Sequence, residues 1–339
     1  MTPLVSVIIP CRNEARSINR CLDSVLASDY PPGRLEVIVA DGMSHDRTRQ
    51  QVESYASRDA RVRCIDNPGL TTPQALNRAI AAARGDLILR LDAHAGIAAD
   101  YIGRAVDSLE RYGADCVGGA IRTRTHGSGI FAEPIRVGLS HFFGVGNSHF
   151  RTGPDGPRWV DTVYGACWRR EVFDRVGWFN EDLVRSQDIE FSSRLRRAGG
   201  RILVSPEMHI DYYVRGTLGA FWRQNWTNGM WAVLPFVFSE GIAVRWRHLA
   251  PLGLLVSLAI SAAAGLGIFV AAPYIALNLA ASAHAAWKER RPALVLRMPV
   301  VFASLHVAYG MGSVWGCARL SASLFRQGLV KRTATEVAE

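Results

Sequence analysis

The sequence predicts an α/β domain with a mostly parallel, doubly wound sheet, followed by an α-helical membrane region. Up to about residue 215, short β-branched runs alternate with segments of helical periodicity, which is the pattern of βαβ units. Residues 249–287 contain no Asp, Glu, Lys or Arg, and this stretch is long enough for two spanning helices. The 339 residues, 49% of them hydrophobic, can form a large core and exclude global disorder.

The first half of the chain alternates strands and helices in order. Apolar residues of the first predicted helix fall on one face, a break follows at Pro31-Pro32-Gly33, and Gly85 ends the third helix. Parallel strands joined in this way should have right-handed crossovers. The predicted strands are 4–10, 35–41, 61–66 and 87–92, and the predicted helices are 14–27, 46–57, 73–83 and 188–198.

Charge and cysteine content narrow the class of partner. The net charge of +9 favours an acidic partner, either anionic lipid or a phosphorylated substrate. No run of Lys and Arg is interleaved with aromatic residues, so nucleic acid is not expected as a partner. The six cysteines form no C-x-x-C pair, which predicts reduced thiols facing the cytosol rather than a zinc site or disulfide framework.

The C-terminal region contains two apolar blocks bounded by basic residues. The first is 249–287, and the second, 298–318, follows Arg297. A buried helical domain is the alternative, but the length without charge favours the membrane. Basic clusters at 245–247, 288–291 and 326–332 would all prefer the cytoplasmic side. The first block then forms a hairpin, while the second is one span or a re-entrant or interfacial helix, giving two or three crossings.

A segment rich in tryptophan lies between the two parts of the chain. Aromatic residues gather at membrane–water interfaces, so residues 216–247 could form an amphipathic helix in that interface. A core helix packed on the sheet fits the pattern equally well. The tryptophans are Trp222, Trp226, Trp231 and Trp246.

Acidic residues follow three of the predicted strands. Asp92 ends a buried strand, where a carboxylate is costly unless it meets a cation, a ligand or a hydrogen-bond network. Glu14 and Asp41 follow the first and second strands, and parallel strands bring their carboxyl ends to one edge, where ligands of open α/β sheets bind. Taken alone, Asp92 could equally be a loop-capping residue.

The type of ligand follows from what the loops contain. The chain has no G-x-G-x-x-G after its first strand and no G-x-x-x-x-G-K, which argues against dinucleotide oxidoreductases and P-loop enzymes. Acidic strand ends suggest instead a divalent cation between a carboxylate and a ligand diphosphate. Asp188 stands in the first turn of a later helix, as a helix-capping acid or as a general base.

Together these motifs make the chain resemble a family 2 glycosyltransferase with the GT-A fold. It is especially similar to the bacterial exopolysaccharide branch that includes succinoglycan-type glucosyltransferases. The resemblance covers residues 4–215 and is weaker over 223–229 and the hydrophobic tail. It rests on VSVIIPCRNE, VIVADGMSHDRT, the triplet Asp92-Ala93-His94, GWFNED and SQDIEFSSRLRRAG.

The resemblance implies an inverting transfer of a sugar from a nucleotide diphosphate sugar, foremost a UDP-hexose. The acceptor would be a polyprenyl-linked saccharide in exopolysaccharide or cell-surface glycan synthesis. Asp188 would deprotonate the acceptor hydroxyl, and Asp92, with His94, would hold Mg²⁺ or Mn²⁺. The residues expected to bind the nucleotide sugar are Pro10, Arg12, Asn13, Glu14, Asp41, Ser44, Asp92 and Ala93.

The chain departs from the family pattern at two positions. His94 replaces the usual third-position Asp, and it could be a metal ligand, a hydrogen-bond donor to the diphosphate, or a bystander; imidazole suits Mn²⁺ better than Mg²⁺. Gln187 replaces a Glu before the catalytic Asp, which removes a neighbouring negative charge. The acceptor or the diphosphate could also contact Gln187, Arg223, Gln224 and Trp226, although RQNW resembles the Q-x-x-R-W element of processive synthases only loosely.

These inferences predict a multi-pass protein of the cell inner membrane with a cytoplasmic catalytic domain. The predicted parts are a GT-A domain over 1–215, an acceptor-side segment over 216–247, membrane helices over 248–320 and a basic tail over 321–339. Its partners would be the nucleotide sugar, the polyprenyl-linked acceptor and membrane lipid. The alternative function is a catalytically inactive nucleotide-sugar-binding scaffold in a polysaccharide assembly complex, which the departures at His94 and Gln187 support.

Overall fold

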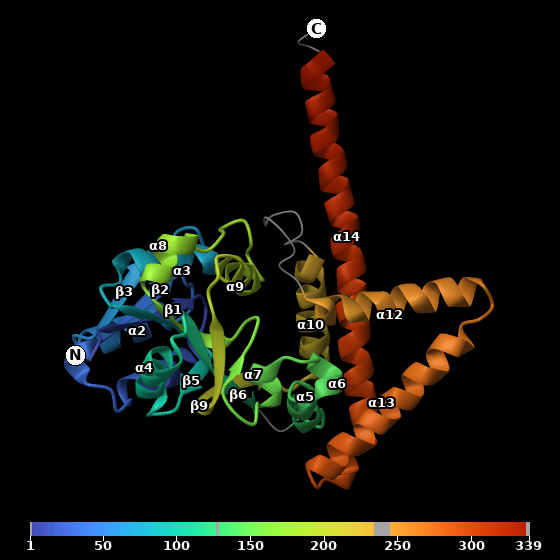
Figure 1. The fold of residues 1–339 in the computed structure, drawn as a ribbon, viewed down its shortest axis with the longest axis horizontal. Helices are drawn as coiled ribbons and strands as arrows, with labels where there is room; N and C mark the ends of the chain where they lie inside the picture. The colour runs from blue at the N-terminus through green and yellow to red at the C-terminus, as the bar shows by residue number, and fades with distance from the viewer. Residues whose placement is uncertain (1, 127–128, 234–244, 337–339) are drawn as a thin grey trace. The chain divides into compact units, whose positions relative to one another are not determined.

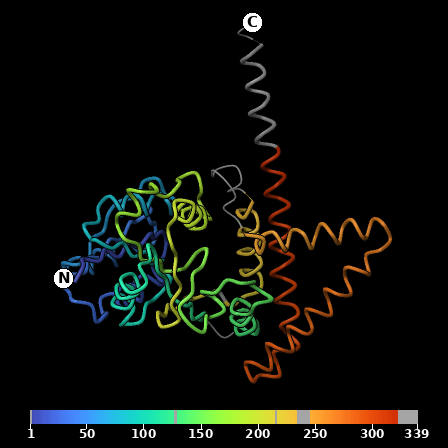
Figure 2. Tube along the Cα trace, in the orientation of Figure 1, coloured from blue at the N-terminus to red at the C-terminus, as the bar shows by residue number. Residues whose placement is uncertain are grey.

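The computed structural model divides the chain into two compact units. It describes residues 2–126, 129–233 and 245–336. The first unit consists of Met1–His126 and Asn147–Val214, and the second of Gly127–Gly146 and Arg215–Glu339. Figures 1 and 2 show the path of the chain through both units.

The first unit is built on a mixed sheet with a parallel half. The order of its main strands is β3-β2-β1-β4-β8-β6-β9-β5, with β7 paired to β9. β1 lies between β2 and β4, and β2 pairs with β3, all in parallel. The later strands pair in antiparallel fashion, as β4 with β8 and β5 with β9. The strands are β1 (Val5–Cys11), β2 (Leu35–Asp41), β3 (Val62–Asp66), β4 (Leu87–Arg90), β5 (Ala95–Ile97), β6 (Cys116–His126), β7 (Arg158–Trp159), β8 (Tyr164–Arg169) and β9 (Ile202–Arg215).

Helices cover both faces of this sheet, as Figure 1 shows. Val7 and Ile9 of β1 join a core with residues of α1 and α4, whereas Ile8 joins a second core with residues of α3, α8 and α9. Such alternation is what a central strand buried on both faces requires. The helices of this unit are α1 (Ile18–Leu26), α2 (Thr48–Ala56), α3 (Thr72–Ala82), α4 (Tyr101–Tyr112), α7 (His149–Thr152), α8 (Glu171–Val176) and α9 (Gln187–Arg197), with one 3₁₀ turn, Pro32–Arg34.

The predicted elements correspond to those observed, with differences at two ends. α1 begins at Ile18 rather than at residue 14, because Asn13 has a φ of 57° and Glu14 starts a turn whose carbonyl accepts from the backbone N–H of Ser17. β4 ends at Arg90, so Asp92 lies in the following loop, although the N–H of Leu91 still donates to the carbonyl of Ile8. Parallel pairing is confined to β1–β4, whereas the sequence predicted a mostly parallel sheet.

The second unit is helical. Three of its helices are long and apolar enough to cross a membrane, namely α12, α13 and the Met298–Ser321 part of α14. Most apolar side chains of α12 and α13 are exposed, as Ile260, Phe269 and Leu277 illustrate, and this is typical of a lipid-facing surface. The helices are α5 (Ala132–Gly138), α6 (Phe142–Val145), α10 (Leu218–Val233), α12 (Trp246–Ala263), α13 (Ile268–Lys288) and α14 (Met298–Glu336), with a 3₁₀ turn at Pro292–Leu294.

Of the tryptophan-rich segment 216–247, residues Leu218–Val233 form α10, which packs along α14 (Figure 1). Trp246 begins α12, and residues 234–244 lie outside the described part of the chain. Glycines permit the close approach of α10 to α14: a Cβ at Gly312 would lie 2.0 Å from the carbonyl oxygen of Trp226, and one at Gly229 would lie 1.9 Å from that of Tyr309. The Ser313 hydroxyl donates to the Gly229 carbonyl at 3.0 Å. Small residues at helix contacts are a common device of membrane proteins. An interfacial position for α10 stays a prediction.

The segment 127–146 belongs to the second unit although it lies within the sequence of the first. Arg136 of α5 pairs with Glu289, just after α13, and Arg291 pairs with Glu133 at 3.0 Å. Phe143 of α6 meets Phe302 of α14 edge to face, and the Phe143 carbonyl lies 2.8 Å from Nε2 of His306. The short helices α5 and α6 therefore pack on the candidate membrane-spanning helices, which lie far along the sequence.

Candidate active site

The candidate site lies at the carboxyl edge of the parallel strands. Cys11 is in register with Asp41, and Asp41 in turn is in register with Asp66. Ile8 of β1 pairs with Arg90 of β4, so the loop that carries Asp92 leaves the sheet beside the loop that follows β1. The alternation of strands in the sequence therefore brings the acidic strand ends to a common edge.

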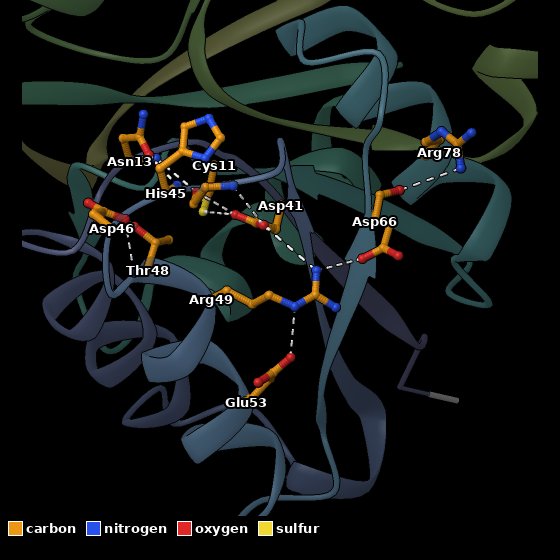
Figure 3. A network of polar contacts seen from close by, with 11 residues as sticks. Cys11, Asn13, Asp41, His45, Asp46, Thr48, Arg49, Glu53, Asp66 and Arg78 are labelled. Carbon is orange, nitrogen blue, oxygen red and sulfur yellow. Dashed lines mark hydrogen bonds and ion pairs between the residues drawn. The ribbon is translucent and has the colours of Figure 1, made fainter.

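The loops after β1 and β2 are tied together by polar contacts, most of which Figure 3 shows. The Ser44 hydroxyl donates to Oδ1 of Asp41 at 2.5 Å and accepts from the backbone N–H of Asn13 at 2.9 Å. Oδ1 of Asn13 accepts from the N–H of His45 at 2.9 Å. Asn13 and Met43 both have left-handed backbone conformations, with φ of 57° and 53°. The two loops thus form one rigid assembly.

Asp41 is completely buried within this assembly. Its carboxylate accepts from both the backbone and the side chain of Ser44, and Nη1 of Arg49 lies 3.8 Å away (Figure 3). Arg49 is held more tightly by Asp66, at 2.6 Å. Burial and the charge of Asp41 raise the pKa of the Cys11 thiol. Asp41 fixes the shape of the loop in this structure, and direct contact with a nucleoside stays a prediction.

The remaining residues expected around the nucleotide are arranged along the same loops. Pro10 lies within β1, in register with Ala40. Arg12 is exposed, and its side chain packs against Gly42, since a Cβ added to Gly42 would lie 3.2 Å from the Cβ of Arg12. Ala93 lies between Asp92 and His94 in the sequence. Its side chain is buried, so it contributes packing to that loop.

Glu14 connects the β1 loop with the Asp92 loop. One of its carboxylate oxygens accepts from the Ser17 hydroxyl at 2.5 Å, and the other lies 3.4 Å from Nδ1 of His94. Burial alone would raise the pKa of Glu14, but hydrogen bonds from His94 and Ser17 lower it below its usual value. Conversely, burial would lower the pKa of His94, whereas Glu14 and the charge of Asp92 raise it. Both groups are therefore biased toward a charged pair.

Asp92 is held by the arginine two residues before it. Nε and Nη2 of Arg90 lie 3.2 and 3.1 Å from Oδ1 of Asp92, and both side chains are mostly buried. Burial would raise the pKa of Asp92, but the charges of Arg90 and His94 lower it, which keeps the carboxylate ionised. The Tyr164 hydroxyl faces this carboxylate without making a hydrogen bond of standard geometry.

The charge of Asp188 also acts on Arg90. Asp188 is the second residue of α9, after Ser186, whose backbone is left-handed with a φ of 62°. Burial lowers the pKa of Arg90, but the charges of Asp92 and Asp188 raise it overall. Gln187 is buried, and within the described residues its Oε1 has no hydrogen-bond partner. The charge of Arg90 thus interacts both with Asp92, the proposed metal ligand, and with Asp188, the proposed base.

Three residues of this site were not identified from the sequence. Arg90 had a signal, because it is the only charged residue in an otherwise apolar strand segment. Tyr164 and Tyr212 had none, since tyrosines are common on strands. Their rings contact edge to face with centroids 5.3 Å apart, and Tyr212 contacts His94 in the same way at 5.3 Å. The rings of Tyr164 and Tyr212 therefore lie next to each other beside His94.

Arg223, Gln224 and Trp226 lie on α10, in the second unit. Arg223 is exposed, and the other two are partly buried. Contact of these three residues with an acceptor or a diphosphate stays a prediction.

The donor set at Asp92 suits a cation that is shared with a ligand. Among the residues that the structure describes, no three His, Cys, Asp or Glu side chains converge as a ready-made metal site. Asp92 and His94 supply one carboxylate and one imidazole, a pair compatible with Mn²⁺. A divalent cation held by few protein ligands normally completes its coordination with water and phosphate oxygens. The residues fit a metal that arrives with a diphosphate.

Comparison with known proteins places the chain in a family. The family model for Glycosyl transferase family 2 matches residues 6–177. The succinoglycan biosynthesis protein ExoA of Rhizobium meliloti (strain 1021) is 31% identical over 310 residues, which cover 83% of this chain and 92% of that protein. A dolichyl N-acetyl-alpha-D-glucosaminyl phosphate 3-beta-D-2,3-diacetamido-2,3-dideoxy-beta-D-glucuronosyltransferase of Methanococcus voltae is 24% identical, with 98% of each chain covered.

Solved structures show the same fold. The mannosyltransferase PcManGT from Pyrobaculum calidifontis, in complex with GDP-Man and Mn²⁺, aligns with a TM-score of 0.61 and 24% identity, covering 93% of this chain and 88% of that one. S. aureus TarS 1–349 aligns with a TM-score of 0.52 and 18% identity, covering 96% and 92%. The predicted GT-A fold is therefore confirmed. The chain belongs to glycosyltransferase family 2.

Proposed function

We propose that this glycosyltransferase inverts the anomeric centre of a nucleoside diphosphate sugar, foremost a UDP-hexose, and transfers the sugar to a polyprenyl-linked saccharide. The observation that carries the proposal is the common sheet edge at which Glu14 contacts His94 and Arg90 holds Asp92, with the charge of Asp188 acting on the same arginine. A donor-side carboxylate and a carboxylate suited to act as base thus lie within one electrostatic network. The relative in succinoglycan biosynthesis supports an exopolysaccharide or cell-surface glycan as product.

The chemistry requires a base on the acceptor side and charge stabilisation on the donor side. Asp188 removes the proton from the acceptor hydroxyl, whose oxygen then forms a bond to the anomeric carbon. The bond from that carbon to the donor phosphate oxygen breaks, and the nucleoside diphosphate leaves with the electron pair. Asp92 and His94 would hold Mg²⁺ or Mn²⁺, which supplies neutralisation of charge on the leaving group.

Asp92 and His94 are prepared for this role before any ligand arrives. The Arg90 contact uses Oδ1 of Asp92, and the Glu14 contact uses Nδ1 of His94. To bind a metal, His94 would have to be neutral, with its Nδ1–H donating to Glu14 and its Nε2 carrying the lone pair. Fixed orientation of such groups lowers the reorganisation that the reaction requires.

The proposed acceptor is lipid-linked because the same chain provides helices able to reach the lipid. Three candidate spans follow the glycosyltransferase domain, and basic residues flank them at Arg245, Arg247 and 288–291. By the tendency of basic residues to remain inside, the enzyme would work at the cytoplasmic face of the inner membrane. A lipid-linked acceptor would then be held near the bilayer surface.

The test is the substitution Asp188→Asn, assayed with membranes, labelled nucleotide sugars and a lipid acceptor extract. Loss of the base should lower transfer by about 10²- to 10⁴-fold while donor binding is retained. Asp182→Asn is the matched control, because Asp182 is an exposed acid just before α9. Undiminished transfer by Asp188→Asn would remove this residue from the role of base. Donor binding without turnover by the wild type would favour the inactive scaffold.

A further inference from the structure

Arg151, an arginine outside the sequence motifs, stands beside the candidate site and has one buried nitrogen without a hydrogen-bond partner among the described residues. It lies in α7, which packs against β6 within the first unit. Its Nη1 is buried, and among the described residues this atom has no hydrogen-bond partner. No carboxylate of the described residues forms an ion pair with it. The side chain as a whole is partly buried, but Nη1 has lost its hydration and gains no acceptor in return.

Aromatic rings hold Arg151 in place. The guanidinium carbon lies 5.4 Å from the centroid of the Tyr212 ring and 5.7 Å from that of Phe150. A cation–π contact engages the charge of the guanidinium group through a ring face and consumes none of its N–H donors. The group is therefore oriented while its donors stay available for an oxygen ligand.

The position of Tyr212 connects Arg151 with the donor side of the site. The Tyr212 ring meets His94 edge to face at 5.3 Å and meets Tyr164 in the same way at 5.3 Å. The Tyr164 hydroxyl is also buried, and it too has no standard hydrogen bond to any described residue. Nη1 of Arg151 and the Tyr164 hydroxyl, which faces Asp92 without a hydrogen bond of standard geometry, thus flank the same tyrosine, and His94 contacts its ring.

We propose that Arg151 binds phosphate oxygens of the substrate, namely those of the donor diphosphate, across the Tyr212 ring from His94. This inference rests on the proposed function and adds a residue to it. Guanidinium is suited to this task because its planar N–H groups match two phosphate oxygens at once. The positive charge would stabilise the departing diphosphate from a side that Asp92 and His94 do not cover.

The experiment measures binding of UDP and GDP to the full-length protein in detergent, with Mn²⁺ present. Arg151→Met should weaken binding of the nucleoside diphosphate by about ten- to a hundredfold, because it removes charge-assisted hydrogen bonds. Binding of the corresponding nucleoside, which has no phosphate, should stay within about twofold. Arg151→Lys keeps the charge but not the planar fork, and should fall between the two. Arg158→Met, at an exposed arginine of the nearby β7, is the control and should bind like the wild type.

A second arm separates the donor diphosphate from a phosphate of the lipid-linked acceptor. If Arg151→Met leaves diphosphate binding unchanged but raises the KM for the acceptor, the guanidinium group still binds phosphate, and the assignment to the donor is overturned. Unchanged values in both arms would overturn the inference altogether. If the wild type itself binds neither UDP nor GDP, the proposed function fails before Arg151 is tested.

Thermal unfolding distinguishes binding from a structural role. Without ligand, Arg151→Met should be as stable as the wild type or more stable, since the buried Nη1 lacks a partner in the free protein. Added nucleoside diphosphate should raise the Tm of the wild type more than that of the variant. A marked drop in the Tm of the unliganded variant would show that Arg151 serves the fold, which contradicts the proposal.

Discussion

Two nitrogens of Arg90 share one oxygen of Asp92, with Nε and Nη2 at 3.2 and 3.1 Å from Oδ1. Both side chains are mostly buried, so each charge is stabilised by the other in place of the water that it has lost. The pair fixes the loop after β4, and this loop also contains His94. Arg90, the charged residue within an otherwise apolar strand segment, thereby orients Asp92, which is proposed to face the donor.

Substitution of Arg90 should expose this dependence. Arg90→Met leaves the Asp92 carboxylate without its partner, and we expect a loss of about 2–3 kcal/mol in the free energy of unfolding. The double variant Arg90→Met with Asp92→Asn should regain part of that stability, because the Asp92 charge is removed together with its partner. Denaturant unfolding in detergent measures both values. The double variant should still be inactive in sugar transfer, so recovered activity would contradict the role of Asp92.

Removal of divalent cations should stop the reaction. We expect EDTA to reduce transfer to background and Mn²⁺ to restore it, because Asp92 and His94 form a carboxylate–imidazole pair. His94→Asp should shift the preference from Mn²⁺ toward Mg²⁺, since carboxylate oxygen is the harder ligand. Titration of each metal into the chelated enzyme checks both expectations. Full activity in EDTA would exclude the metal site, and an unchanged preference would make His94 a bystander.

Glu36 should make the first unit sensitive to acid. This residue of β2 is buried and accepts from the Ser6 hydroxyl at 2.6 Å and the Arg84 backbone N–H at 2.6 Å. Burial would raise the pKa of Glu36, but these hydrogen bonds lower it below its usual value. A lowered pKa in the folded state contributes stability above the unfolded pKa of about 4.3, and this stability is lost as pH falls through the folded value.

The matching measurement compares Glu36→Gln with the wild type across pH. The variant should be less stable at pH 7 by about 2 kcal/mol, and the difference should shrink as the pH falls below about 5. Glu53→Gln is the control, since Glu53 is exposed and its pairing with Arg49 should contribute at most about 1 kcal/mol. A gap between the Glu36 variant and the wild type that is constant with pH would refute the electrostatic explanation.

Packing of α10 on α14 should be intolerant of a single methyl group. Gly312→Ala places a Cβ 2.0 Å from the Trp226 carbonyl oxygen, so the helices must separate, at an expected cost of about 1–3 kcal/mol. Gly253→Ala in α12 is the matched control, because no atom lies within 4 Å of the added Cβ there. Thermal unfolding in detergent should show a lower Tm for the first variant and no loss for the second.

The sequence predicted strands and helices best where a short local pattern of residues was enough to define them. Short β-branched apolar runs and breaks at Gly and Pro located β1 to β4 and the helices between them, and they brought Asp41 and Asp92 to one edge. The antiparallel half of the sheet was not predicted, because strands such as β6 and β8 pair across about 50 positions and show no local signal of their partner.

The site was predicted less completely than the fold for a similar reason. Glu14, Asp92, His94 and Asp188 belong to recognisable segments, whereas Tyr164, Tyr212 and Arg151 reach the same region only through long-range packing. Arg90 was visible as a charge within an apolar strand, but its interaction with Asp188 depends on the position of α9, which no pattern in the strand specifies.

The discontinuous second unit has a consequence for how the chain is made. His306 lies 163 positions after Phe143, the residue whose carbonyl it contacts. At ordinary rates of translation the ribosome needs on the order of ten seconds or more to synthesise that interval. During this time the apolar side chains of α5 and α6 have left the ribosome while their helical partners have not yet been made. During synthesis, α5 and α6 therefore cannot reach the packing described above until α14 has been made.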